Sequence, residues 1–336
     1  MRIFFLLFLS FLLIDISYGQ NLEWNVNLHG FADNQEFASA GLPSSTTFGM
    51  RFSPEVGLRI DSTSRIRIGF NSLHEFGDKH NFAKKIDPVV YYNYQNKELD
   101  FYLGAFPRYN FLKNYPKALL RESHQYFRPN LEGFLFNYSN KNFNQQAWID
   151  WTSKQTETDR ENFVVGVSGT VRSKNVYFSH FFTLWHNALT SVHNPDDHIQ
   201  DNAAFNARVG VNLSEMIFLD SLDINVGGLM SFDRLRDVYD WRTPKGLLLG
   251  AHLAYRSFFI QDEFYIGEAQ SIGFGDAFYN SKRYNRLDLG WNALKSKGLE
   301  ASLLVSFHFI PGSMSNQQVI NLRYNFGGNL PLKRNR

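Results

Sequence analysis

Basic side chains are concentrated in one stretch of the chain, residues 107–129, which reads PRYNFLKNYPKALLRESHQYFRP. Its single acidic residue is Glu122. Its cations are Arg108, Lys113, Lys117, Arg121 and Arg128. Such a cluster attracts anions, and Arg and Lys around a narrow aqueous opening select for negatively charged solutes. The alternative is a surface loop whose cations face water or pair with the phosphates of surrounding lipid.

A second set of arginines follows two neighbouring segments in which polar and apolar residues alternate. If Phe52, Val56 and Leu58 face outward from a sheet, the alternation places a row of arginines on the inner face. These are Arg51, Arg59, Arg65 and Arg67. Inner arginines can line an aqueous lumen, or they can brace it by pairing with acids such as Glu23 or Asp288. The sequence favours neither role.

Hydrolytic chemistry has weak support in the sequence. Serine and histidine lie close together at Ser179–His180 and at Ser306–His308, but no spacing sets a nucleophile against a base with an orienting acid. Residues 193–201, HNPDDHIQD, carry two His and three Asp that could bind a divalent cation, although a solvated acidic turn explains them better. We therefore expect no enzyme activity, no metal site and no cofactor.

The elements that position these residues are indicated by period-two alternation. Between Leu299 and Phe309 the odd positions are apolar and most even positions are polar, which predicts a strand of about eleven residues with one apolar face. About sixteen such segments recur, close to the ten-residue unit of a tilted membrane strand. They begin near residues 22, 47, 64, 88, 98, 131, 143, 161, 175, 202, 220, 246, 257, 283, 298 and 317.

The connections between these segments alternate between short and long. The long ones cover about 33–46, 76–87, 107–130, 153–160, 187–201, 234–245, 269–282 and 310–316. This regularity predicts an all-β fold, a transmembrane antiparallel β-barrel with short periplasmic turns and long outer loops. The mean hydropathy of −0.32 agrees with a barrel, because a membrane strand shows only alternate side chains to lipid.

The two ends of the chain and its composition restrict the possible location and chemistry of the protein. Arg2, the apolar run IFFLLFLSFLLI, and the small residues Ser17 and Gly19 predict a cleaved secretory signal over residues 1–19. We expect the barrel to occupy residues 20–328 and a basic periplasmic tail to occupy residues 329–336. The absence of Cys excludes disulfides, thiolate metal sites and cysteine nucleophiles. The net charge is only +2 and no dense basic run precedes the tail, so the sequence lacks the signature of a nucleic-acid-binding protein.

Together, the signal, the alternating segments, the long loops and the last segment QVINLRYNF resemble bacterial outer-membrane β-barrels of the porin type. In that class the last strand carries the signal for the barrel-assembly machinery, an alternating apolar row that ends in an aromatic residue. The matching residues here are Ile320, Leu322, Tyr324 and Phe326. The resemblance also implies that the third long loop folds into the lumen, where its basic residues would form a pore constriction.

The expected function is therefore a porin-like channel for passive diffusion of small hydrophilic solutes, with a mild preference for anions. One alternative is a non-conducting barrel that binds an outer ligand or partner, or serves envelope assembly; inward Tyr102, Trp148 and Trp185 favour it because they consume pore volume. A lipid-modifying barrel enzyme is the third possibility. The expected partners are outer-membrane lipid and lipopolysaccharide. The expected location is the outer membrane of a Gram-negative bacterium, reached through the secretory pathway.

Overall fold

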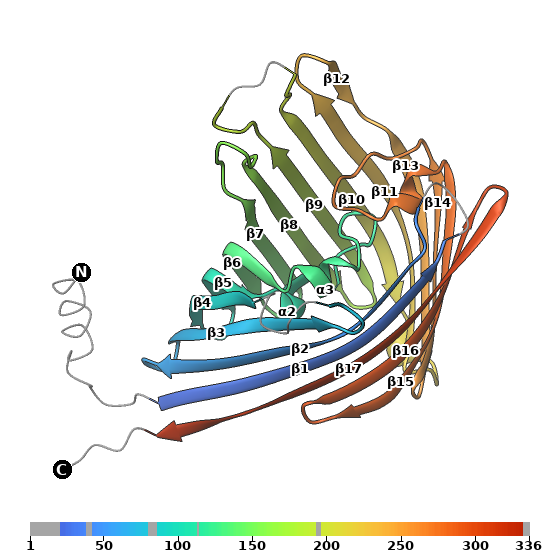
Figure 1. Cartoon of the computed structure of the whole chain (residues 1–336). Coiled ribbons are helices and arrows are strands. Elements are labelled where there is room, and N and C mark those ends of the chain that lie inside the picture. The colour runs from blue at the N-terminus through green and yellow to red at the C-terminus, as the bar shows by residue number, and fades with distance from the viewer. Residues whose placement is uncertain (1–20, 38–41, 80–85, 113, 193–195, 332–336) are drawn as a thin grey trace, which may run out of the picture.

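The computed structural model describes residues 21–37, 42–79, 86–112, 114–192 and 196–331. It shows one antiparallel sheet, in which β1 and β17 pair and close the wall (Figure 1). The strands are β1 (Asn21–Glu36), β2 (Ser45–Arg59), β3 (Ser64–Glu75), β4 (Ile86–Gln95), β5 (Leu99–Pro107), β6 (Asn130–Ser139), β7 (Phe143–Ser153), β8 (Asn162–Ser173), β9 (Val176–Asn187), β10 (Gln200–Asn212), β11 (Ser221–Leu235), β12 (Tyr239–Arg242), β13 (Lys245–Tyr255), β14 (Phe258–Gly267), β15 (Arg283–Ser296), β16 (Leu299–Ile310) and β17 (Ser313–Pro331). The expected all-β barrel is confirmed.

The barrel wall has sixteen strands, as expected, because β12 is a four-residue strand inside the long connection between β11 and β13. Strands β11 and β13 pair directly with each other below it. Among the described residues, no helix is long and apolar enough to cross a bilayer.

The final hairpin differs from the expectation. The predicted long connection over residues 310–316 is a turn of only Pro311 and Gly312, and Gly312 has the positive φ of +80° that such a turn needs. Small polar residues after it resemble a loop in sequence, but Ser315 is fully buried and its neighbour Met314 is 52% exposed. They therefore continue the strand, and the strict alternation of long and short connections ends here.

The last strand is also longer than expected. β17 continues to Pro331, three residues beyond the expected barrel boundary at residue 328. Residues 329–331 pair with the start of β1, so they belong to the barrel rather than to a tail. The proposed signal (residues 1–19) and the rest of the tail lie outside the described residues.

The two faces of each strand differ in the way the alternation predicts. On β16, Leu303 and Phe309 are exposed on the outer wall, whereas Ser306 and His308 are buried inside. On β17 the four residues of the expected assembly signal all lie on the exposed outer face. Tyr324 stacks on Phe326, and Trp24 of β1 meets the same Phe326 edge to face. The assembly role of this aromatic cluster stays a prediction.

The lumen contains an apolar cluster. The connection between β5 and β6, residues 108–129, lies inside the wall and contains two short helices, α2 (Tyr109–Leu112) and α3 (His124–Phe127) (Figure 1). We call this segment the inner loop. Its Ala118 and Leu119 are fully buried in a cluster that includes Trp148 of the wall. Such packing holds the inner loop against the wall and reduces the free cross-section of the lumen.

The connection between β14 and β15, residues 268–282, packs against the inner loop and is called the second inner loop. It contains the 3₁₀ helix η3 (Ala277–Asn280). The backbone N–H of Arg121 donates to Phe274 O at 2.9 Å, and that of Asp276 donates to Lys117 O at 2.9 Å. A Cβ at Gly275 would lie 2.0 Å from Ala118 O, so only glycine allows this close approach.

Candidate functional sites in the lumen and on the outer wall

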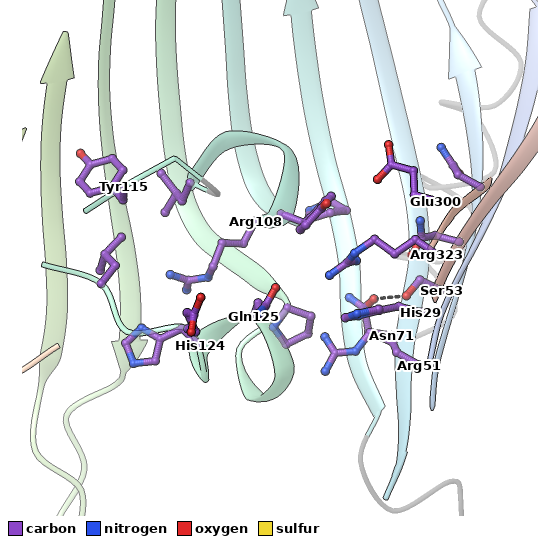
Figure 2. Close-up of a pocket in the computed structure, with 18 of the residues that line it drawn as sticks. His29, Arg51, Ser53, Asn71, Arg108, Tyr115, His124, Gln125, Glu300 and Arg323 are labelled. Carbon is purple, nitrogen blue, oxygen red and sulfur yellow. Dashed lines mark hydrogen bonds between the residues drawn. The ribbon is translucent and has the colours of Figure 1, made fainter. Parts of the chain in front are cut away.

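A cavity of about 480 Å³ lies between the inner loop and one side of the barrel wall (Figure 2). Strands β1, β2, β3 and β17 supply its wall, and the inner loop faces them. Asparagines of the strands line it together with several charged side chains. Those that matter below are His29, Arg51, Ser53, Glu55, Arg121, Glu122, His124, Glu300 and Arg323. We call this cavity the lumenal pocket.

The residues expected to form a pore constriction serve mainly to fix the inner loop. Buried Arg108 forms an ion pair with Asp150 and donates to Arg128 O at 2.9 Å and to Asn130 O at 3.0 Å. Lys117 Nζ lies 2.9 Å from Glu122 and 3.0 Å from Asp288. These cations are thus partly neutralised.

Two of the expected constriction residues, Arg121 and Arg128, are held by longer polar contacts. Arg121 lines the lumenal pocket and donates from Nε to His124 Nε2 at 3.2 Å, and Arg128 Nε lies 4.0 Å from Asp150. Lys113 lies outside the described residues.

The four arginines expected along the lumen all point inward, but they contact different kinds of partner. Arg59 and Arg67 both pair with the buried carboxylate of Glu23, the bracing arrangement weighed from the sequence. Arg65 lies 3.4 Å from Gln95 Oε1, and its charge also acts on Glu23 and Asp100. Arg51 donates to the backbone carbonyl of Tyr126 and so ties β2 to the inner loop.

The electrostatic environment of the inner loop lowers the pKa values of two of its side chains. Burial opposes ionisation of Glu122, but Arg286 and Lys117 outweigh it and lower the pKa of this carboxyl to about 2. Burial, together with repulsion from Arg108, Arg121 and Arg128, lowers the pKa of His124 to about 3. At neutral pH, Glu122 is therefore ionised and His124 is neutral.

Among the described residues, the serines of the lumenal pocket and of the two sequence pairs have hydrogen-bond partners other than histidine. In the pocket, Ser53 donates to Asn71, and His29 Nε2 lies 2.9 Å from Asn321 Oδ1. The serine and histidine pairs noted from the sequence also separate. Ser306 binds Arg286 and His308 binds the Tyr284 hydroxyl, while Ser179 points inward to Thr170 and its neighbour His180 points outward. Among the described residues, none of these serines is hydrogen bonded to a histidine.

A different arrangement lies on the outer wall. His186 of β9, Asp201 of β10 and Arg234 of β11 are direct cross-strand neighbours. They share the outward parity of exposed Phe178, Phe205 and similar residues on these strands. His186 Nδ1 lies 2.9 Å from Asp201 Oδ1, and Arg234 Nη2 donates to Oδ2 at 2.7 Å. We call this group, with Arg236, the wall cluster.

Arg236 completes the wall cluster from the connection after β11. Its Nε donates to Asp201 Oδ2 at 2.8 Å and its Nη2 donates to Oδ1 at 3.1 Å, a bidentate contact. The guanidinium of Arg234 also lies 4.5 Å above the ring of Trp241. Asp201 is thereby held by two guanidinium groups, and it in turn orients the imidazole of His186.

The wall cluster borders an apolar surface with a small residue at its centre. One pair further down, Ala203 stands between Leu184 and Phe232, and below it Phe205 stands between Phe182 and Met230. Ala203 is short and buried, and these larger apolar neighbours flank it on both strands. The apolar surface that they form continues from His186 along the outer face of the wall.

The wall cluster cannot be recognised in the sequence for a specific reason. Along the chain, Asp201 is one of three acids in residues 193–201, and the first three residues of this stretch lie outside the described residues. Within the described residues, no group of three His, Asp or Glu is arranged to hold a metal ion. The available signal was polar residues at outward positions of strands β9 and β10, but only the strand register sets His186 opposite Asp201.

Comparison with known proteins gives both a fold and a family. Residues 14–332 match the family described as lipid A 3′-O-deacylase-type. The chain belongs to this family. A comparison with curated proteins finds no significant match.

Solved structures similar to this lipid A 3′-O-deacylase-type protein include OmpT of Vibrio cholerae with loop L8 deleted, with a TM-score of 0.58, 8% identity, and coverage of 91% of this chain and 99% of that chain. OpdK of Pseudomonas aeruginosa, solved with vanillate, gives 0.53 and 10% identity, with coverage of 91% and 99%. At these identities the likeness concerns the fold alone, which confirms the expected architecture of an outer-membrane β-barrel.

Family membership corrects two expectations. The expected porin function is wrong, because the family is one of lipid A deacylases, outer-membrane barrel enzymes that modify lipid A. The expectation of no enzyme activity is wrong for the same reason, since a deacylase is a hydrolase. The lipid-modifying barrel enzyme, the third possibility that the sequence offers, is the one that family membership supports.

Proposed function

We propose that this lipid A 3′-O-deacylase-type barrel hydrolyses an ester-linked acyl chain of lipid A at the wall cluster. The observation that carries the proposal is the His186–Asp201 pair, held by two arginines on the outer wall directly beside an apolar surface. A lipid reaches this wall from within its own leaflet.

The geometry supports a general-base mechanism. A proton on His186 Nδ1 donated to Asp201 leaves Nε2 free to take a proton from water. The hydroxide formed attacks the ester carbonyl, and the protonated Nε2 then returns its proton to the departing sugar oxygen. The acyl C–O bond breaks, so the products are a free fatty acid and a lipid A with a hydroxyl at that position.

The surrounding residues fit the substrate. Arg234 and Arg236 are about a third exposed or more, so the N–H groups not used by Asp201 can bind lipid A phosphates or the developing oxyanion. The apolar side chains around Ala203 suit contact with an acyl chain. In this arrangement the long-loop end of the barrel faces the outer leaflet of a Gram-negative outer membrane, after export through the secretory pathway.

The proposal is tested by incubating the purified protein with lipopolysaccharide and analysing lipid A by mass spectrometry. The wild type should release the 3′-O-linked chain, and His186→Asn should lower the rate by about 10²-fold or more, the usual contribution of a general base. Asp201→Asn should act in the same direction. His180→Asn is the matched control, because His180 lies on the same outer face of β9 without an acidic partner.

One further variant separates the wall from the lumen. If His29→Asn abolishes release while His186→Asn leaves it intact, the active site lies in the lumenal pocket and the wall assignment fails. Loss of activity in His180→Asn to the same degree as in His186→Asn would also contradict the proposal.

A further inference from the structure

We propose that the lumenal pocket binds a ligand that carries a phosphate group. The pocket is separate from the wall cluster, since it lies inside the barrel between the inner loop and strands β1, β2, β3 and β17 (Figure 2). Arg51 and Arg323 extend from the strand side of the cavity, and Arg121 lines it from the inner loop.

Among the described residues these three arginines form no close ion pair, although Asp87 and Glu300 attract Arg51 and Arg323 from a greater distance. None of the ion pairs among the described residues includes Arg51, Arg121 or Arg323. Arg121 contacts His124, and Arg323 lies 3.6 Å above the ring of Tyr109. Neither neighbour is a carboxylate, so neither forms an ion pair with these cations.

The acids that line the same cavity are largely occupied elsewhere. Glu55 accepts from the Tyr91 hydroxyl at 3.0 Å and lies 3.6 Å from Arg67. Glu122 is held by Lys117 and Arg286. Glu300, exposed and directly opposite Arg323 on the neighbouring strand, remains as the single counter-charge among the described lining residues. The pocket therefore has an excess of positive charge.

Buried polar atoms without partners point to a missing ligand. Arg51 Nε and His124 Nδ1 belong to buried side chains that line the cavity, and neither atom has a hydrogen-bond partner within the described residues. An unsatisfied buried donor is costly, so a native structure that keeps two at one cavity calls for a ligand there.

The number and type of donors select phosphate over carboxylate. Guanidinium forks match both anions, but three cations from different sides fit a tetrahedral group with three free oxygens better than a planar group with two. The pKa of His124 is consistent with a positive potential in this region. Burial lowers it, and so does repulsion from Arg108, Arg121 and Arg128. Leu112, Tyr115 and Leu120 give the cavity an apolar side that accommodates the rest of the ligand.

Isothermal titration calorimetry of the folded protein in zwitterionic detergent tests the site, with inorganic phosphate and glycerol 3-phosphate as probes. The wild type should bind both, and Arg51→Gln or Arg323→Gln should weaken binding by about tenfold or more, the usual effect of losing a charged hydrogen bond. Arg65→Gln is the matched control, an inward arginine of β3 that does not line the pocket. It should bind like the wild type.

Two comparisons complete the test. Lysophosphatidic acid carries the same head group as glycerol 3-phosphate, so tighter binding of the acylated form identifies a lipid source and equal binding identifies a soluble one. The proposal is overturned if none of the probes at millimolar concentration gives a heat of binding. It is also overturned if Arg65→Gln weakens phosphate binding as much as Arg51→Gln and Arg323→Gln do. Lipid A hydrolysis by Arg51→Gln and Arg323→Gln should be unchanged, which shows that they are folded and separates this site from the wall cluster.

Discussion

Arg286 of β15 donates from Nη2 to the carboxylate of Glu122 at 3.1 Å, and this contact joins the barrel wall to the inner loop. The same guanidinium donates from Nε to Asp288 at 2.7 Å, and its Nη1 lies 3.8 Å from Asp276 of the second inner loop. One side chain, 4% exposed, therefore connects the wall with both segments that fill the lumen.

Replacing Arg286 should destabilise the protein strongly. Arg286→Met leaves Glu122, Asp276 and Asp288 near one another without their shared cation, and breaking a buried ion pair in this way costs about 3–5 kcal/mol. Urea unfolding in detergent micelles measures the change. Arg242→Met is the control, because Arg242 is exposed and stacks only on Tyr239, and its midpoint should barely move. Equal midpoints for the two variants would mean that the network contributes little.

Stability should fall on acidification because of His124. Its pKa is lowered from 6.5 to about 3 in the folded protein, so the unfolded state binds more protons between these values. The contribution is fully present above pH 6.5 and is lost as the pH falls toward 3. Thermal unfolding measured across this range should show a smaller pH dependence for His124→Gln than for the wild type. His252→Gln should retain the wild-type dependence; if it also flattens the curve, His124 is not the cause.

The orientation of β16 predicts that the same substitution costs very different free energies of folding at two neighbouring positions. Leu303→Arg places a charge on the outer wall and should cost about 2–4 kcal/mol near the bilayer midplane, whereas Ser302→Arg points into the lumen and should cost far less. Folding titrations into lipid vesicles measure both. Similar losses for the two variants would contradict the assignment of the outer face to lipid.

The proposed active site requires the long loops to face outward. A protease site inserted next to Asp196, in the connection between β9 and β10, should be cleaved on intact cells, because that connection adjoins the wall cluster. The same insertion next to Lys297, in the short turn between β15 and β16, should be protected. Cleavage at the second site alone would reverse the orientation and remove the wall cluster from the outer leaflet.

Strand positions and facing could be predicted from sequence because alternation is local. Expected starts at residues 64, 143 and 283 coincide with Ser64, Phe143 and Arg283, and the inward arginines follow from the same parity. The final hairpin failed because Ser313 and Ser315 look like loop residues unless their burial is known. Small polar side chains are ambiguous when the interior of the fold is itself polar.

The candidate site could not be predicted in the same way, because it depends on pairing between strands. His186 and Asp201 are separated by a long connection, and only the register of β9 and β10 brings their side chains within 2.9 Å. The inner loop was recognised as basic, but its partners Asp150 and Asp288 lie on strands β7 and β15, far along the chain. Charge counted along the sequence therefore overstated the free charge in the lumen.

The seam between β1 and β17 sets an order for biogenesis. The first strand pairs with the last along its whole length, from Asn21 opposite Pro331 to Glu36 opposite Asn316. During synthesis and export β1 emerges first, so one of its edges has to wait with unpaired N–H and C=O groups until the chain is complete. Closure is then a late and all-or-none event, and a chain that ends before β17 leaves a permanent open edge inside the bilayer, where such groups have no water to bind.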